Sequence, residues 1–179
     1  MAIKKIVSIP DPRLRQISEK IIHFDNELKT LITDLIDTLE AQNDPPGIGI
    51  AAVQIGVLKR VFIARLGNKL KEFINPEIID YGKEESELFE GCLSVHHHYG
   101  YVYHPTSVTI KAQDINGEVF VAKYKNLAAR IMQHETDHLN GILYIDHVAA
   151  QKNKILKITG QDKEGNDIFE EVNINQWQK

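Results

Sequence analysis

The stretch Gln133-His-Glu-Thr-Asp-His-Leu-Asn-Gly141 carries two histidines and a glutamate in the pattern H-E-x-x-H. Residues four apart lie on one face of a helix, so His134 and His138 can bind one metal ion. Glu135, beside the first histidine, can act as a base. A catalytic metal usually has three protein ligands and one open position. The stretch therefore predicts a helix built for metal chemistry, and the third ligand must come from elsewhere.

The residues on either side predict a helix over 126–140 whose apolar stripe faces the core. Leu127, Ile131, His134 and His138 follow one another at spacings of four, three and four. Gly141 then stands in the usual left-handed stop position. Two stacked histidines on a buried face rarely both find neutral partners, whereas one metal ion serves both. Two core histidines bonded to backbone groups are the alternative interpretation.

The rest of the chain predicts a second helix and several hairpins. Apolar residues at spacings of three and four predict a helix over 25–42, capped by Asp25 or Asn26. Alternation and turn residues predict paired strands over 60–64 and 71–74, 108–112 and 118–124, and 155–158 and 167–174. Helices mixed with hairpin-linked strands indicate the α+β class. We expect one catalytic domain over 1–179, with a β-hairpin tail over 151–179.

Composition excludes several classes of partner. The chain has 179 residues with 42% hydrophobic and 26% charged, which suits one soluble domain. A net charge of −4 gives no attraction to nucleic acid or to an anionic membrane. The first residues resemble neither a signal peptide nor a membrane span, and the single Cys92 cannot form an internal disulfide. We expect a cytoplasmic protein of a bacterium, or one of an organelle.

The third metal ligand does not follow the patterns of known H-E-x-x-H proteases. The metzincin template needs a histidine at position 144, which is Tyr144, and His147 comes three residues too late. Other zincins use a glutamate on a downstream helix, and the residues after 147 predict no such helix. Upstream, Cys92 lies in a polar, glycine-containing turn, where a thiolate can bind Fe(II), Zn(II) or Ni(II). A small buried hydrophobe is the other interpretation of a lone cysteine.

Three motifs together resemble the peptide deformylase family: GIGIAAVQ (47–54), EGCLS (90–94) and QHETDHL (133–139). The phrases SIPDPRLR (8–15), FINPEII (73–79) and ILYIDHV (142–148) extend the resemblance over about residues 3–150. The resemblance implies antiparallel β-strands packed around a central helix that carries H-E-x-x-H. It also implies a hydrolase that removes the formyl group from the N-terminal formyl-methionine of nascent polypeptides.

The resemblance implies a role for each motif residue. Cys92, His134 and His138 would bind one divalent metal ion, natively Fe(II), with Zn, Ni or Co able to replace it. The metal would lower the pKa of a bound water, and Glu135 would take the water's proton and pass it to the leaving amine. Two donors would stabilise the oxyanion: the Gln54 side-chain amide and the Leu93 backbone N–H. A peptide substrate would add as a strand along Gly47, Ile48 and Gly49.

Residues around these motifs carry weaker expectations. Asp137 would accept a hydrogen bond from a ligating histidine, and Glu90 would brace the cysteine loop. The family usually has proline at the position of His96 and arginine at that of His104. We expect His96, His97 and His98 on the surface, although they are close enough to Cys92 to compete for metal. The acidic tail after residue 150 argues against ribosome docking through a basic C-terminal helix.

Three other functions remain open from the sequence. The changed 96–104 segment motivates an amidase of the same fold with a different acyl or peptide preference. A catalytically silent metal- or peptide-binding relative is a second alternative, although it would have no need for Glu135. A zincin-type endoprotease is the third, and it lacks its third ligand.

Overall fold

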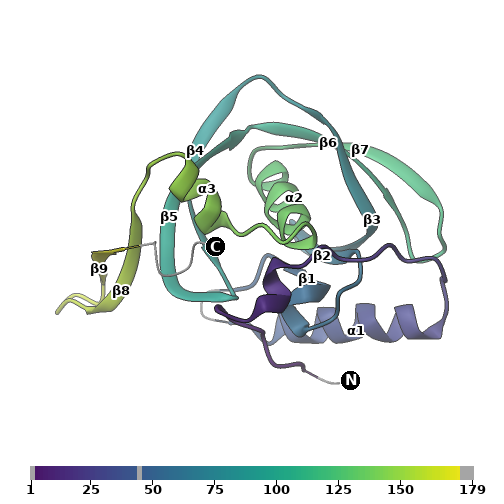
Figure 1. The fold of residues 1–179 in the computed structure, drawn as a ribbon, viewed down its shortest axis with the longest axis horizontal. Helices are drawn as coiled ribbons and strands as arrows, with labels where there is room; N and C mark the ends of the chain where they lie inside the picture. Colours follow the sequence, from purple (N-terminus) through teal and green to yellow (C-terminus); the bar gives the residue numbers. More distant parts are fainter. Residues whose placement is uncertain (1–2, 44–45, 174–179) are drawn as a thin grey trace.

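The computed structural model describes residues 3–43 and 46–173, and Figure 1 shows two antiparallel sheets around one central helix. The five-stranded sheet has the order β1 (Gly49–Ala51), β2 (Val61–Leu66), β3 (Lys69–Tyr81), β6 (Ser107–Gln113), β7 (Val119–Lys125). The four-stranded sheet has the order β4 (Glu85–Cys92), β5 (Val95–Pro105), β8 (Ile155–Gln161), β9 (Asp167–Val172). The helices are α1 (Asn26–Glu40), α2 (Asn126–Leu139) and α3 (Tyr144–Ala150), with 3-10 turns η1 (Pro12–Arg15) and η2 (Ala52–Ile55).

Helix α1 covers one face of the five-stranded sheet. The side chain of Asp25 accepts hydrogen bonds from the backbone N–H groups of Glu27 and Leu28, so Asp25 is the N-cap. The apolar residues of α1 pack against one alternating set of strand residues. The buried members of this cluster are Leu28, Ile32, Leu35, Leu39, Ile50, Ala52, Val61, Ile63 and Ile74. The predicted helix over 25–42 is therefore present and ends two residues earlier.

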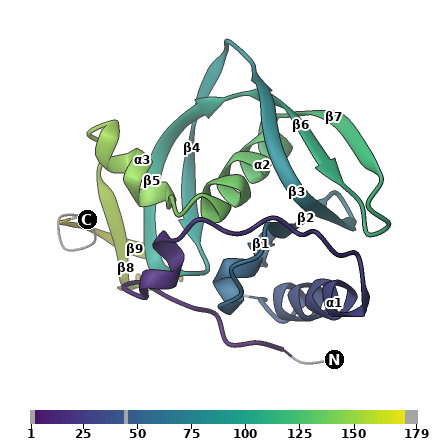
Figure 2. The same cartoon turned by 45° about the vertical axis from the view of Figure 1, so that its right-hand side comes forward.

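Helix α2 covers the opposite face of the same sheet and lies between the two sheets (Figure 2). Phe62 and Ala64 of β2 point to α2, whereas Val61 and Ile63 point to α1, as the twofold alternation of a strand requires. Residues of α2 in this core are Ala129, Ile131, Met132 and Leu139. The predicted stripe is correct except at its start, because Leu127 is 55% exposed.

The predicted α+β class is confirmed, because the structure combines two antiparallel sheets with three α-helices in the described residues. Strands β4 and β5 were not predicted, because β4 is mostly exposed and charged and shows no apolar alternation. Helix α3 was not predicted either. It has seven residues and contains no glutamate, so a zincin ligand of that kind is absent from it.

The tail forms part of the second sheet within the described residues. Strand β8 pairs with β5, and β9 pairs with β8, so the hairpin extends the sheet that contains Cys92. Phe169 on β9 packs edge-on against Phe89 and Tyr99, with ring centroids 5.6 and 6.0 Å apart. The expected end of the last strand at Ile174 lies outside the described residues. Among those residues, no helix has the length and apolar character needed to cross a membrane.

The end of α2 depends on Gly141, which adopts the predicted left-handed conformation with φ 73°. A Cβ at this position would lie 2.6 Å from the backbone oxygen of Arg15. The N-terminal segment is also hydrogen-bonded to α2 here, because Ser18 N–H donates to the Leu139 carbonyl. Gly141 thus permits both the helix stop and the close passage of the N-terminal segment.

We predict that Gly141→Ala lowers the free energy of unfolding by more than Gly165→Ala does. Both glycines have a positive φ, so each alanine costs about 1–2 kcal/mol in a left-handed conformation. Only Gly141 adds a backbone clash, since no atom lies within 4 Å of a Cβ at Gly165. Urea unfolding of the two variants measures the difference. Equal losses would contradict the role given to the Arg15 contact.

Candidate metal centre and active site

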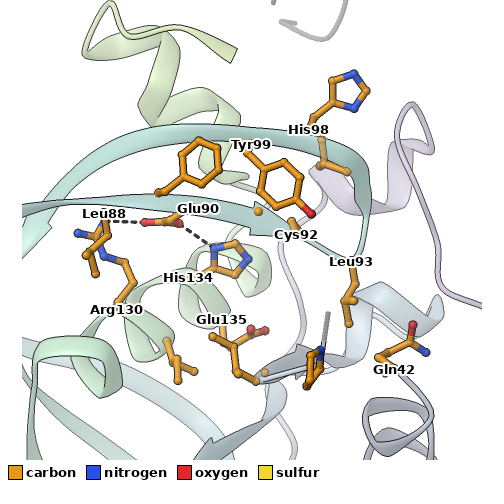
Figure 3. Close-up of a pocket in the computed structure, with 18 of the residues that line it drawn as sticks. Gln42, Leu88, Glu90, Cys92, Leu93, His98, Tyr99, Arg130, His134 and Glu135 are labelled. Atoms are coloured by element: carbon orange, nitrogen blue, oxygen red, sulfur yellow. Dashed lines mark hydrogen bonds and ion pairs between the residues drawn. The ribbon is translucent and has the colours of Figure 1, made fainter. Parts of the chain in front are cut away.

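The three candidate metal ligands come together at one end of the β4–β5 hairpin. One donor atom from each of Cys92, His134 and His138 lies within 4.8 Å of the others. Cys92 Sγ is 3.2 Å from His138 Nε2. The cysteine comes from the end of β4 and the histidines from consecutive turns of α2, as Figure 3 shows for Cys92 and His134. A thiolate and two imidazoles are a donor set suited to late divalent metal ions.

A bulge in the hairpin carries Cys92 toward α2. The β4–β5 register shifts between Gly91 and Cys92, and Cys92 pairs with Val95. A shift of this kind re-aims a side chain at the end of a strand. Gly91 is needed here, because a Cβ would lie 2.5 Å from the ring of Tyr99. Cys92 is therefore the last residue of β4, and the expected turn follows it at Leu93 and Ser94.

The histidine ring nitrogens fit a cation. His134 Nδ1–H donates to Glu90 Oε2 at 3.0 Å, which leaves the Nε2 lone pair free for a ligand. His138 is 1% exposed, and its Nδ1 has no hydrogen-bond partner among the described residues. Because His138 Nε2 faces Cys92 Sγ at 3.2 Å and one metal ion can bind both atoms, the arrangement favours a bound ion over two core histidines.

Glu135 lies beside the ligands with an unused carboxylate oxygen. It is 4% exposed, and its Oε2 has no hydrogen-bond partner among the described residues. Burial raises the pKa of its carboxyl to about 7, against the opposing effect of His134. Gly49 faces it so closely that a Cβ there would lie 2.3 Å from Glu135 Oε1. Gly49 therefore makes room for this carboxylate as well as for any substrate.

Gln54 is a buried residue, and its amide has one possible orientation. Its Oε1 accepts a hydrogen bond from Ala51 N–H at 2.8 Å. Its Nε2 consequently faces the metal ligands, 3.5 Å from Cys92 Sγ and 3.3 Å from Ser94 Oγ. Gln54 is 1% exposed, so it is not a surface amide.

An open cleft of about 440 Å³ gives access to these groups. Gly47, Ile48 and Gly49 form part of its wall, and Cys92 and Leu93, which Figure 3 shows near each other, also line it. Gly47 also packs on α1, because a Cβ there would lie 2.5 Å from Leu39 Cδ1. Apolar side chains at the cleft include Ile48, Leu88, Leu127 and Ile131. The cleft therefore joins an apolar wall to a group of buried polar side chains.

Comparisons with known proteins agree with this geometry. The sequence profile described as Polypeptide deformylase matches residues 3–154. A peptide deformylase of Novosphingobium aromaticivorans is 39% identical over 176 residues, which cover 85% of this chain and 92% of the relative. One of Natranaerobius thermophilus is 43% identical over 148 residues, with 82% and 92% covered.

A solved structure shares the fold at similar identity. The crystal structure of a peptide deformylase from Legionella pneumophila has a TM-score of 0.78 at 40% identity, with 84% of this chain and 89% of that chain covered. The chain belongs to the polypeptide deformylase family. Its reaction is a metal-dependent hydrolysis that removes the formyl group from the N-terminus of nascent polypeptides. The predicted family and reaction are thereby confirmed.

Glu90 has a larger role in this deformylase than bracing the cysteine loop. Besides His134, its carboxylate binds Arg130, whose Nη1 lies 2.5 Å from Glu90 Oε1 (Figure 3). Burial alone would raise the pKa of Glu90, but His134, His104 and Arg130 outweigh it and lower the pKa to about 2. Arg130 is held in turn by the carbonyls of Val102 and Ser86. Glu90 is therefore a buried, ionised carboxylate that fixes the candidate ligand His134.

The sequence analysis did not identify Arg130. This residue supplies the guanidinium that the family's usual arginine at position 104 would otherwise supply. The only signal was an arginine four residues before His134, on the buried face of α2. His104 instead donates from Nδ1 to Gln133 Oε1 at 3.2 Å, and its Nε2 is 3.5 Å from Glu90 Oε1. Burial lowers the pKa of His104 to about 4, so it is a neutral neighbour of the Arg130–Glu90 pair.

The expectation for Asp137 is wrong. Its carboxylate accepts a hydrogen bond from His147 Nε2 at 2.7 Å and not from a ligating histidine. His96 and His97 are exposed, as expected, whereas His98 is half-buried. All three lie along the cleft, and none belongs to a metal-binding group of the described residues.

We predict that Arg130→Met lowers the free energy of unfolding by about 3–5 kcal/mol, because it leaves the buried Glu90 carboxylate without its cationic partner. Arg130→Lys keeps the positive charge and should lose less stability. Its ammonium group lacks the fork geometry with which the guanidinium donates to both carbonyls. Urea unfolding of the metal-free variants measures this. If Arg130→Met and Arg130→Lys were equally stable, the charge of Arg130 would have no part in holding Glu90.

A second substitution tests whether the guanidinium has exchanged positions. His104 Nε2 already lies 3.5 Å from Glu90 Oε1, so an arginine at 104 can reach the same carboxylate. The double variant His104→Arg/Arg130→Met should recover stability relative to Arg130→Met alone. The double variant His104→Gln/Arg130→Met is the matched control, since glutamine brings no charge.

Proposed function

We propose that Cys92, His134 and His138 bind one divalent metal ion in this deformylase, and that the ion in the cell is Fe(II). The converging donors, the His138 Nε2 that faces Cys92 Sγ, and the His134 ring whose Nδ1 is already bound to Glu90 support the ligand set. A mixed thiolate–imidazole site accepts Fe(II), Zn(II), Ni(II) or Co(II). When bound, such an ion lowers the pKa of water so that hydroxide is available near neutral pH.

Glu135 moves the proton in the proposed mechanism. Its free Oε2 accepts the proton of the attacking water at the cleft floor. The same oxygen then donates that proton to the amine that leaves as the formyl C–N bond breaks. Gly49 leaves room for this carboxylate, because the Cβ of any larger residue at position 49 would clash with Oε1.

Gln54 and Leu93 stabilise the developing oxyanion. The Gln54 amide is oriented by Ala51, so an N–H of its Nε2 is directed to the region beside Cys92 where the formyl oxygen would lie. We assign the second donor to the Leu93 backbone N–H, which follows the ligand Cys92 in the chain. Fixed donors of this kind cost no reorganisation during the reaction.

The substrate peptide adds along the edge of the five-stranded sheet. Strand β1 has β2 on one side only, so its other edge is free of described strands and borders the cleft. Gly47, Ile48 and Gly49 lead into this edge, where backbone hydrogen bonds can hold an extended peptide. The apolar side chains of Leu88, Leu127 and Ile131 suit the methionine side chain.

The decisive experiment measures formate released from formyl-Met-Ala-Ser by protein purified without oxygen and loaded with Fe(II). Bound metal is quantified in the same samples. We predict formate release at one iron per chain, and no comparable release of acetate from the acetyl-Met peptide. Full metal occupancy without a preference for the formyl group would favour an amidase of different acyl specificity. Metal without any turnover would favour a silent relative.

Glu135→Gln should lower kcat by about 100-fold or more with metal content unchanged, because a general acid–base group contributes that much. Glu118→Gln is the control, since Glu118 is an exposed carboxylate outside the residues that line the cleft. A Glu135→Gln protein that turned over substrate as fast as the parent would show that another group moves the proton.

We infer that the chain works as one catalytic domain in the bacterial cytoplasm, without nucleic acid or membrane as a partner. The hairpin β8–β9 supports one domain because it extends the sheet that carries Cys92. Its exposed surface is acidic and suits neither RNA nor the ribosome. The protein should therefore remain in the supernatant when ribosomes are sedimented at physiological salt. Salt-sensitive cosedimentation would overturn this inference.

A further inference from the structure

A second group of ligand-type side chains lies outside the catalytic cleft. It consists of His104 on β5, Asp137 on α2 and His147 on α3, and one donor atom from each lies within 4.8 Å of the others. All three are absent from the described residues that line the cleft. The rings of His104 and His147 meet edge to face, with centroids 4.7 Å apart. Three different elements thus converge on one point beside α2.

The orientation of each side chain leaves lone pairs for a cation. Gln133 Nε2 donates to the carbonyls of Pro105 and Ala129, which fixes Gln133 Oε1 toward His104 Nδ1. Because that oxygen can only accept, Nδ1 carries the hydrogen, and the lone pair of His104 is on Nε2, which lies 3.5 Å from Glu90 Oε1. His147 Nε2 faces Asp137 Oδ2 at 2.7 Å, so a metal ion can replace the proton between them.

The solvent exposure of the three side chains and the distances between their donor atoms also suit a bound metal ion. The side chains of His147 and Asp137 are 30% and 22% exposed, whereas that of His104 is 8% exposed. The group is therefore anchored on its inner side and open to solvent on its outer side. Donors bound at about 2.1 Å in a tetrahedron lie roughly 3.4 Å apart. The 2.7 Å between His147 Nε2 and Asp137 Oδ2 must widen and the longer separations, up to 4.8 Å, must shorten, and the partly exposed His147 side chain has room for this movement.

We propose that His104, Asp137 and His147 form a second metal site, which binds a late divalent transition metal such as Zn²⁺ through two imidazole nitrogens and one carboxylate. The donor set lacks sulfur, unlike that of the catalytic centre. The ion would join β5, α2 and α3. Asp137 precedes His138 and Gln133 precedes His134, so the ion would also hold the helix that carries the catalytic histidines.

The rival site for a second ion is the exposed group His96, His97 and His98. His98 Nδ1 is already engaged with the His96 carbonyl at 2.6 Å, and the His96 and His97 ring centroids lie 6.3 Å apart. Among the described residues, these three histidines do not form a group whose ligand atoms all lie within 4.8 Å of one another, as the proposed ligands do. Substitutions distinguish this rival site from the proposed one, so the experiment includes variants of both groups.

The test uses full-length protein whose catalytic centre is filled with Ni²⁺, dialysed against Zn²⁺, with both metals quantified. We expect one Zn²⁺ per chain in addition to one Ni²⁺. His147→Gln and His104→Gln should weaken zinc binding by about 100-fold or more, since each removes a direct ligand. His23→Gln, an exposed histidine elsewhere, is the matched control and should bind zinc like the parent.

Two further readouts are independent of enzyme activity. Zinc should raise the thermal midpoint of the Ni²⁺-loaded parent, since an ion bound only to the folded state stabilises it, and it should not do so for His147→Gln. Co²⁺ added as a second equivalent should give no new thiolate charge-transfer band. The proposal is overturned if the parent binds no zinc beyond its nickel. It is equally overturned if His97→Gln loses the zinc while His147→Gln retains it.

Discussion

The buried ion pair between Arg130 and Glu90 is the interaction on which the site depends. It joins the helix that carries both histidines to the strand that carries the cysteine, so that ligands 46 residues apart meet. A carboxylate and a guanidinium are removed from water here, and that desolvation is costly unless every polar atom finds a partner. Glu90 satisfies this by binding both Arg130 and His134, and Arg130 by binding two backbone carbonyls.

Much of the fold follows from local sequence signals. The periodicity of α1, the Asp25 cap and the Gly141 stop each determine a local structure, and all three are present in the protein. The β4–β5 hairpin could not be predicted in this way. Its residues are charged and exposed on one side, and its stability comes from pairing along its length and from contacts with distant segments, which no local window contains. Helix α3 is short and depends on its packing against Val95 and Val102.

The site also has a part that the sequence predicts and a part that it does not. The chemical identity of Cys92, His134, Glu135 and His138 is visible in the motifs, because metal binding and proton transfer require particular side chains. The supporting contacts are not visible there. Arg130, rather than position 104, supplies the guanidinium, since two different backbone positions can deliver the same group to one carboxylate. Asp137 could bond to any nearby histidine, and only the packing of α3 decides that the partner is His147.

The C-terminal hairpin acts on the interior of this enzyme through a relay of aromatic rings. Phe169 supports Tyr99, and Tyr99 occupies the space over Gly91 that any side chain at that position would need. Gly91 immediately precedes the metal-binding cysteine. In evolutionary terms, a lineage that exchanged this hairpin for another kind of tail would also remove part of the wall behind its thiolate. The tail and the cysteine loop are therefore expected to change together across the family's history.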